Sequence, residues 1–430
     1  MAGSALSPLA GFAQDDKITN WAGNYTYGTP SITKAGSVEE VQAFIRKHPR
    51  LKVLGTRHCF NNIADSRDHF LSLAPLNKMV ALDTKAHTVT VEGGVRYGEL
   101  AVFLNDKGYA LHNLASLPHI SVAGGCATAT HGSGIHNGNL SSAVAGMEFI
   151  PASGDMVKLD KHSAEFGLAV VHLGGMGPVT KVTLAVQPTY QVWQYVYENL
   201  PMAALEKHFE EIMGAGYSVS LFTDWSSSAV NEVWIKSKTA SHSGDPEFFG
   251  AKAATKNLHP IRDLGAENCT EQMGKPGPWH ERLPHFRMGF TPSSGKELQS
   301  EFFVPREHSY EAIRAVARLH EKISPHLLIS EVRCIDGDQL GMSPCYHQPS
   351  TAIHFTWKPE WEAVRQLLPQ IEAVLAPFNA KPHWGKLFTM SHQRLAALYP
   401  KMAEFQKLLK HYDPQGKFRN EYLDKVIFGV

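Results

Sequence analysis

The first part of the chain mixes helical and strand periodicities over short distances. Apolar side chains recur every three or four positions in residues 38–48 and 97–107, which predicts two amphipathic helices. Between them, two β-rich runs flank a polar turn within residues 79–92, which predicts a β-hairpin. Further short strands are predicted at residues 51–54, 146–150, 156–159 and 179–186. This alternation indicates an α+β module.

From about residue 187 the pattern changes to aromatic strands separated by longer helices. Strands are predicted at residues 217–225, 231–236 and 300–305, and helices at residues 203–214, 310–323 and 360–377. This order predicts a second domain in which helices cover one face of a sheet. A chain of 430 residues also exceeds what one hydrophobic core usually supports, so two domains are expected. The last part, residues 386–430, is predicted to be helical.

Composition and charge are those of an ordinary globular protein. The 41 basic residues balance 41 acidic ones, so no charge excess is available for nucleic acid or anionic lipid. No apolar run approaches the ~20 residues that cross a bilayer. Residues 1–16 lack the basic start and long apolar centre of a signal peptide. We therefore expect a cytoplasmic protein that binds neither nucleic acid nor membranes.

Cysteine and histidine usage argues against structural metal and disulfide frameworks. The five cysteines are scattered and odd in number, which suits a reducing compartment. The 23 histidines invite a metal site, but H-E-x-x-H is absent, and His131 and His136 are spaced wrongly for one helical face. We expect no metal. A metal hydrolase and a non-catalytic binding protein remain alternatives, and both predict a colourless protein.

Two segments are suited to close contact with a ligand. Residues 53–61 (VLGTRHCFN) run from a strand into a tight loop, where successive N–H groups can converge on phosphate. Residues 116–138 are small and glycine-rich, so backbone there can approach a ligand closely. A lone histidine such as His58 in a loop is by itself typical of a surface or capping residue. A nicotinamide dehydrogenase is disfavoured, because no G-x-G-x-x-G follows a strand and opens a helix.

Two later strands each place polar side chains on one face. Residues i and i+2 of a strand point the same way, so Glu331 and Arg333 share a face of LLISEVRCI, and His354 and Thr356 share a face of TAIHFTW. Periodicity alone favours a cross-strand salt bridge on a solvated face. If the face is buried instead, these charges need a partner or a ligand.

The order of these features resembles FAD enzymes of the vanillyl-alcohol oxidase fold, and among them the alditol oxidase (xylitol oxidase) family. The motifs that carry the resemblance are NWAGN at 20–24, ASLPHISVAG at 115–124, HGSG at 131–134, PGPWHERLPHFR at 276–287, KPHWGK at 381–386 and D-P-x-G-K-F-x-N at 413–420. It covers nearly the whole chain beyond residue 17. It implies an α+β fold with a two-subdomain FAD-binding domain at 17–186. A substrate (cap) domain with a large antiparallel sheet flanked by helices would follow at 187–385, and residues 386–430 would return to the FAD-binding domain.

The resemblance further implies FAD bound covalently, through its 8α-methyl carbon, to His58. Other implied cofactor contacts are Val53, Leu54, Gly55, Thr56, Arg57, Cys59, Ser116, Ser121, Gly124, Gly125, Cys126, Ala127, Thr128, Val179 and His383. Relatives commonly have glycine where this chain has Arg57, and a non-glycine residue disfavours positive φ. Either the backbone is ordinary there, or the attachment is less efficient than in relatives. Cys126 follows the glycine pair instead of preceding it, so we expect a packing residue and no second flavin link.

The same resemblance implies a polyol pocket in front of the flavin. Its implied lining is Ser116, Gln299, Glu331, Arg333, His354, Thr356 and Lys386. His354 is the candidate base, since an ordinary histidine pKa of about 6.5 lies near working pH, and the cations Arg333 and Lys386 would stabilise the developing oxyanion. Glu331 would hold Arg333 and hydrogen-bond the substrate.

The expected reaction is oxidation of the C1 hydroxyl of an alditol such as xylitol or sorbitol to the aldose. Hydride would go to flavin N5, and O2 would be reduced to H2O2. The polyol and O2 are the expected partners of a monomeric chain. The alternative is a sugar-lactone oxidase or dehydrogenase on the same fold.

Overall fold

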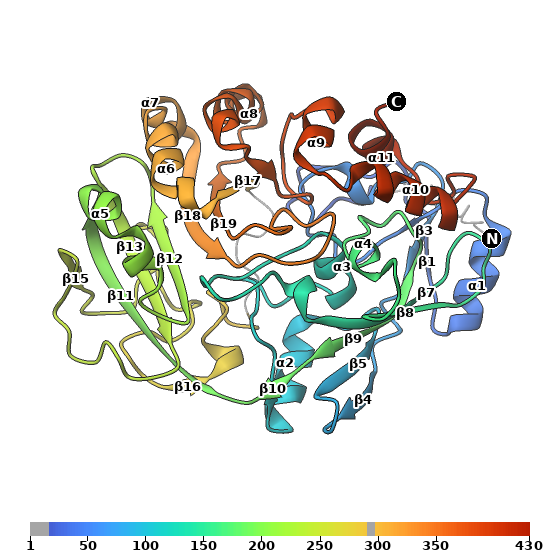
Figure 1. The fold of residues 1–430 in the computed structure, drawn as a ribbon, viewed down its shortest axis with the longest axis horizontal. Coiled ribbons are helices and arrows are strands. Elements are labelled where there is room, and N and C mark those ends of the chain that lie inside the picture. Colours follow the sequence, from blue (N-terminus) through green and yellow to red (C-terminus); the bar gives the residue numbers. More distant parts are fainter. Residues whose placement is uncertain (1–16, 290–296) are drawn as a thin grey trace, which may run out of the picture.

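The computed structural model describes residues 17–289 and 297–430 and is built around two larger sheets with helices packed on them (Figure 1). A small parallel sheet precedes them, in the order β1 (Ile32–Lys34), β3 (Phe70–Ser72), β2 (Lys52–Val53). Helix α1 (Val38–Lys47) packs against this sheet, and its N-terminus is capped by the Ser37 side chain. Strand β2 leads directly into the loop that carries His58.

The first of the larger sheets has five antiparallel strands. Their order is β4 (Met79–Asp83), β5 (Thr88–Glu92), β9 (Val179–Ala185), β7 (Val144–Phe149) and β8 (Val157–Asp160). Strands β4 and β5 form the predicted hairpin. Helices α2 (Tyr97–Asp106) and α3 (Val122–Ala127) contribute to the same hydrophobic core. Smaller elements nearby are β6 (Tyr109–Ala110), which pairs with β10 (Gln187–Pro188), and α4 (Phe166–Ala169).

The second sheet has ten antiparallel strands and occupies the opposite side of the molecule (Figure 1). Its order is β14 (Glu247–Phe248), β15 (Ala251–Ala253), β11 (Gln191–Pro201), β13 (Ala229–Ser237), β12 (Ser218–Thr223), β18 (Leu327–Ile335), β19 (Ser350–Trp357), β17 (Leu298–Pro305) and β20 (Lys381–Pro382), with β16 (Gly277–Pro278) paired to β11. Helices α5 (Met202–Met213), α6 (Ser309–Ala317) and α8 (Trp361–Leu375) share one core with one face of this sheet, as the sequence predicts. Its other face is left for the site.

The structure differs from the prediction in two elements of this part. The helix expected at 310–323 is interrupted, because Leu319 leaves helical geometry and α7 (His320–Ile323) starts anew after it. Strand β11 has no counterpart among the predicted strands. Its side chains are largely buried on both faces, including the polar Gln194, so it lacks the alternation that marks a half-buried strand.

The C-terminal segment is helical, as predicted, and lies on the first half of the chain. Helices α9 (His392–Leu398), α10 (Met402–Tyr412) and α11 (Glu421–Leu423) contribute Leu395, Phe405 and Leu423 to the core of the five-stranded sheet. Lys417 donates its ammonium protons to the Ile45 and His48 carbonyls at 2.6 Å each. Whether 17–186 and 187–385 are separate domains stays a prediction. None of the helices in 17–289 and 297–430 is long and apolar enough to span a membrane.

The core between α8 and the large sheet gives a test of stability. Leu368 is fully buried there, so Leu368→Ala should lower the unfolding free energy by about 2–5 kcal/mol through lost burial and the cavity left behind. Leu264→Ala is the matched control, because Leu264 is 53% exposed. Urea unfolding followed by circular dichroism would measure both variants. Equal midpoints for the two would contradict this core.

Candidate active site

One cavity, of about 640 Å³, joins the glycine-containing loops of the first half to the free face of the large sheet. Predicted site residues that line it are Val53, Gly55, Thr56, Arg57, His58, Cys59, Ser116, Ser121, Gly124, Gly125, Ala127, Thr128, Gln299, Glu331, Arg333, His354, Thr356, His383 and Lys386. Leu54, Cys126 and Val179 do not line it and instead belong to apolar clusters. Cys126 lies with its Sγ 3.4 Å from the Tyr97 hydroxyl, in a packing position.

The loop before His58 has a left-handed residue. Arg57 has φ of 64°, so the first of the two alternatives, an ordinary backbone, is wrong, and less efficient attachment stays a prediction. Its side chain donates to the Thr19 carbonyl at 3.0 Å, and its own carbonyl accepts from Trp21 N–H at 2.7 Å. The Asn20 amide donates to the Cys59 carbonyl at 2.9 Å. The NWAGN segment is therefore fastened over this loop by bonds to its backbone.

His58 is held neutral with its ring nitrogens unused. Both nitrogens are buried and have no hydrogen-bond partner within the described residues. Burial, reinforced by His119, lowers the pKa of His58 to about 4, so the imidazole keeps a free lone pair at neutral pH. The Trp21 ring stacks on it, with centroids 5.2 Å apart and planes 17° apart. An orphaned, oriented nucleophile in a cavity wall fits attachment to an electrophilic cofactor carbon.

The two glycine-containing segments meet at Ser121. Its N–H donates to Thr56 Oγ1 at 3.2 Å, which joins the first loop to the second. A Cβ added to Gly124 would lie 2.7 Å from Ser121 Oγ, and one added to Gly55 would lie 3.2 Å from it. Side chains at these glycines would fill the cradle that the cavity offers to a large ligand, so the residues present fit FAD.

The polar face of the large sheet is a cross-strand row. Glu331 on β18 lies opposite His354 on β19, which lies opposite Glu301 on β17. The next pair on the same face is Thr356 on β19 and Gln299 on β17, which lie opposite each other. Glu331 and His354 are only 5% and 6% exposed, so the expectation of a solvated face is wrong. The buried alternative holds, and its charges need partners.

Glu301 is the partner of several of these buried charges. Its carboxylate accepts from Arg333 Nη2 at 2.9 Å and forms an ion pair with Lys386, while His131 Nε2 lies 3.2 Å away. Burial opposes ionisation, but Lys386, His131 and Arg333 outweigh it and hold the pKa of Glu301 well below its ordinary range. The sequence reasoning missed Glu301, although it lies two positions after Gln299 in a predicted strand. That spacing is the signal that would have found it.

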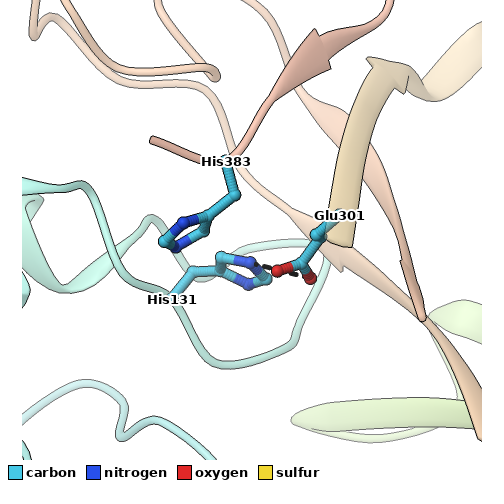
Figure 2. A group of neighbouring side chains, drawn as sticks. All are labelled: His131, Glu301 and His383. Carbon is cyan, nitrogen blue, oxygen red and sulfur yellow. Dashed lines mark ion pairs between the residues drawn. The ribbon is translucent and has the colours of Figure 1, made fainter. Parts of the chain in front are cut away.

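Figure 2 shows Glu301 beside His131 and His383, a grouping whose ligand atoms lie within 4.8 Å of one another, as a metal site would require. The surroundings favour an ion-pair centre. Arg333 and Lys386 already neutralise the carboxylate, and His383 Nδ1 accepts from the Gly385 N–H at 3.1 Å. A metal ion here would be a further cation with no further anion to hold it.

Arg333 keeps its Nε donor for a ligand. Its Nη1 donates to Ser116 Oγ at 3.2 Å and its Nη2 donates to Glu301. Its Nε is buried and has no hydrogen-bond partner in the described part of the chain, while Glu331 Oε2 lies 3.5 Å from it. A donor and an acceptor thus stand side by side in the cavity wall, as a hydroxyl group requires.

The pKa of His354 differs from that of an ordinary histidine. Burial, with help from Lys386, lowers its pKa to about 4, below the ordinary value from which its role was predicted. Its Nδ1 lies 2.9 Å from Lys386 Nζ, and its Nε2 lies 2.9 Å from Thr356 Oγ1. The neutral ring therefore connects Thr356 to Lys386 by hydrogen bonds.

Two family profiles match the chain. The profile of the FAD binding domain matches residues 30–160, and that of D-arabinono-1,4-lactone oxidase matches residues 292–426. The first contains the His58 loop and the glycine-rich segment, and the second contains the row of Glu301, Glu331 and His354.

Full-length relatives sharpen the assignment. The chain is 44% identical to alditol oxidase from a Streptomyces species, over 96% of this chain and 99% of that protein. It is 25% identical to L-gulonolactone oxidase of Mus musculus, over 96% and 98%. Among solved structures, cholesterol oxidase from B. sterolicum superposes with a TM-score of 0.78 at 14% identity, covering 99% of this chain and 100% of that one, which shows a shared fold. With an FAD-binding domain, this fold and this identity, the chain belongs to the alditol oxidase family of FAD-dependent oxidases.

Proposed function

We propose that this protein oxidises the C1 hydroxyl of alditols such as xylitol and sorbitol to the aldose and reduces O2 to H2O2. The observation that carries the proposal is the single cavity in which the FAD-binding loops face a buried row of paired charges. FAD, when bound, supplies the acceptor for the C1 hydride and returns the electrons to O2. Everything else in the reaction falls to the side chains of the cavity.

The buried donor and acceptor favour a polyol. Glu331 is held ionised, because Arg333 and His285 outweigh its burial and lower its pKa, and a carboxylate can only accept hydrogen bonds. Arg333 Nε can only donate. A hydroxyl group hydrogen-bonds to both at once, and a ligand without hydroxyls would leave the buried Arg333 Nε donor without a hydrogen bond, at a cost of about 1–3 kcal/mol.

The substrate proton has a continuous path. We propose that it passes to Thr356 Oγ1 while Thr356 gives its own proton to His354 Nε2, and that His354 passes its Nδ1 proton to the Lys386 amine. The path requires the deprotonated form of Lys386. Burial lowers the pKa of Lys386 and so raises the share of this form, and Glu301 pairs with the ammonium that results from the transfer. The predicted base, His354, thus acts as a relay, and Lys386 ends as the cation beside the reacting oxygen.

We further propose that FAD is joined covalently to His58 Nε2 or Nδ1 through the flavin 8α carbon. The support is the neutral, unpartnered imidazole in the cavity wall and the stacked Trp21 that fixes the plane of its ring. Arg57 adopts the left-handed turn that glycine would provide.

A sugar-lactone oxidase is the second candidate, favoured by the profile match over residues 292–426. Anaerobic mixing separates the two. Xylitol or sorbitol should bleach the flavin absorbance, and readmitted oxygen should restore it with one H2O2 per turnover. Bleaching by L-gulono-1,4-lactone but not by either alditol would reverse the assignment.

His58→Ala should abolish the covalent link. After acid precipitation the yellow colour should stay with the wild-type chain and move to the supernatant with the variant, because no other nitrogen or oxygen nucleophile in the described cavity wall is buried and unpartnered. His87→Ala, at another left-handed position remote from this cavity, serves as control. Colour that remains with precipitated His58→Ala protein would place the attachment elsewhere.

His354→Ala should slow anaerobic flavin reduction by xylitol at least ~100-fold, the usual contribution of general acid–base groups. His320→Ala, on the exposed helix α7, is the control and should leave the rate unchanged. Stopped-flow absorbance under saturating xylitol measures both. A rate for His354→Ala within a few fold of wild type would rule out the Thr356–His354–Lys386 path.

A further inference from the structure

One motif of the sequence, PGPWHERLPHFR at residues 276–287, has no direct part in the proposed reaction. His285 of this motif lines the same cavity beside Glu331, with Nε2 2.7 Å from Glu331 Oε1. The backbone N–H of His285 donates to the Ser116 carbonyl at 3.2 Å. The Phe222 and Trp234 rings meet the imidazole edge-on, with centroids 5.5 and 5.3 Å away. The backbone hydrogen bond and the two ring contacts thus hold the His285 imidazole in place.

Lys236 on β13 completes the arrangement and is only 1% exposed. Its ammonium has three protons and three acceptors: the Leu283 carbonyl at 2.5 Å, the Pro284 carbonyl at 3.3 Å and His285 Nδ1 at 3.0 Å. Since a protonated lysine can only donate, His285 Nδ1 must accept. The imidazole proton therefore stays on Nε2 and is donated to Glu331 Oε1.

We propose that Lys236 and His285 form a positioning dyad for substrate binding. The dyad occupies one oxygen of Glu331 and thereby turns the other, Oε2, toward the donor of Arg333, where a substrate hydroxyl bridges the two. This inference rests on the proposed function, since it gives a residue of the polyol pocket its orientation. Neither member touches the reacting atoms.

The dyad makes polyol affinity sensitive to pH. The charged and titratable groups that face Lys236 are Glu331 and Arg333 on β18, Cys269, and His285. Burial lowers the pKa of Lys236 to about 7, against the opposing effect of Glu331. Below that pH the lysine donates and fixes the tautomer of His285. Above it the neutral amine can accept, the imidazole proton can move to Nδ1, and a lone pair then faces the Glu331 carboxylate.

Steady-state kinetics with xylitol between pH 6 and pH 9 test the dyad. Wild-type KM should rise about tenfold as the pH passes through neutrality, as expected for loss of a hydrogen bond to a charged group, while kcat changes much less. Lys236→Met should have a raised KM that no longer depends on pH. Lys252→Met, an exposed lysine of the same sheet, is the matched control and should follow the wild type.

His285→Gln provides the conservative rescue. Its amide can accept from Lys236 and donate to Glu331 at every pH, so KM should stay near the low-pH wild-type value throughout. A pH-dependent KM in His285→Gln, or a wild-type profile in Lys236→Met, would overturn the dyad, and the first readout serves if Lys236→Met does not fold. A wild-type enzyme that turns over no alditol at any pH would overturn the proposed function and the dyad's substrate role together.

Discussion

A carboxylate with no exposed surface is the constraint on which this site is built. Glu301 is the common partner of Arg333, Lys386 and His131. Removing one partner from a buried ion pair typically costs about 3–5 kcal/mol, because the remaining charge is left uncompensated. The three partners come from strand β18, from the KPHWGK segment and from the HGSG loop. These three separate segments meet at one carboxylate, and each of the three partners also lines the cavity.

The same charges hold the two halves of the chain in register. Arg333, fixed by Glu301, donates to Ser116 in the glycine-rich segment, and the backbone of His285 binds the carbonyl of that same serine. The glycine-rich segment and the polar face of the large sheet are thus joined at one residue. A reaction that moves a hydride between a bound substrate and a bound cofactor needs such a fixed distance, since small misplacements lower rates steeply.

Sequence periodicity was sufficient to place Glu331 with Arg333 and His354 with Thr356, because strand alternation is a local property. It could not decide burial, which depends on what covers the sheet, and so it favoured a solvated face and an ordinary histidine pKa. Glu301 was within its reach by the same alternation. His285 and Lys236 were not, since their roles arise from one contact between residues far apart in sequence. The resemblance to a family named the cavity lining, but the left-handed backbone at Arg57 appears only in three dimensions.

The left-handed Arg57 affects the stage at which the loop before His58 becomes ordered. A non-glycine residue with positive φ costs of order 1 kcal/mol or more, yet its guanidinium binds Thr19 and so ties down the NWAGN segment, which glycine could not do. The conformational entropy of loop and segment is then lost during folding and not during cofactor loading. The loop is thus ordered before the cofactor binds, so the energy of cofactor binding is not spent on ordering the chain.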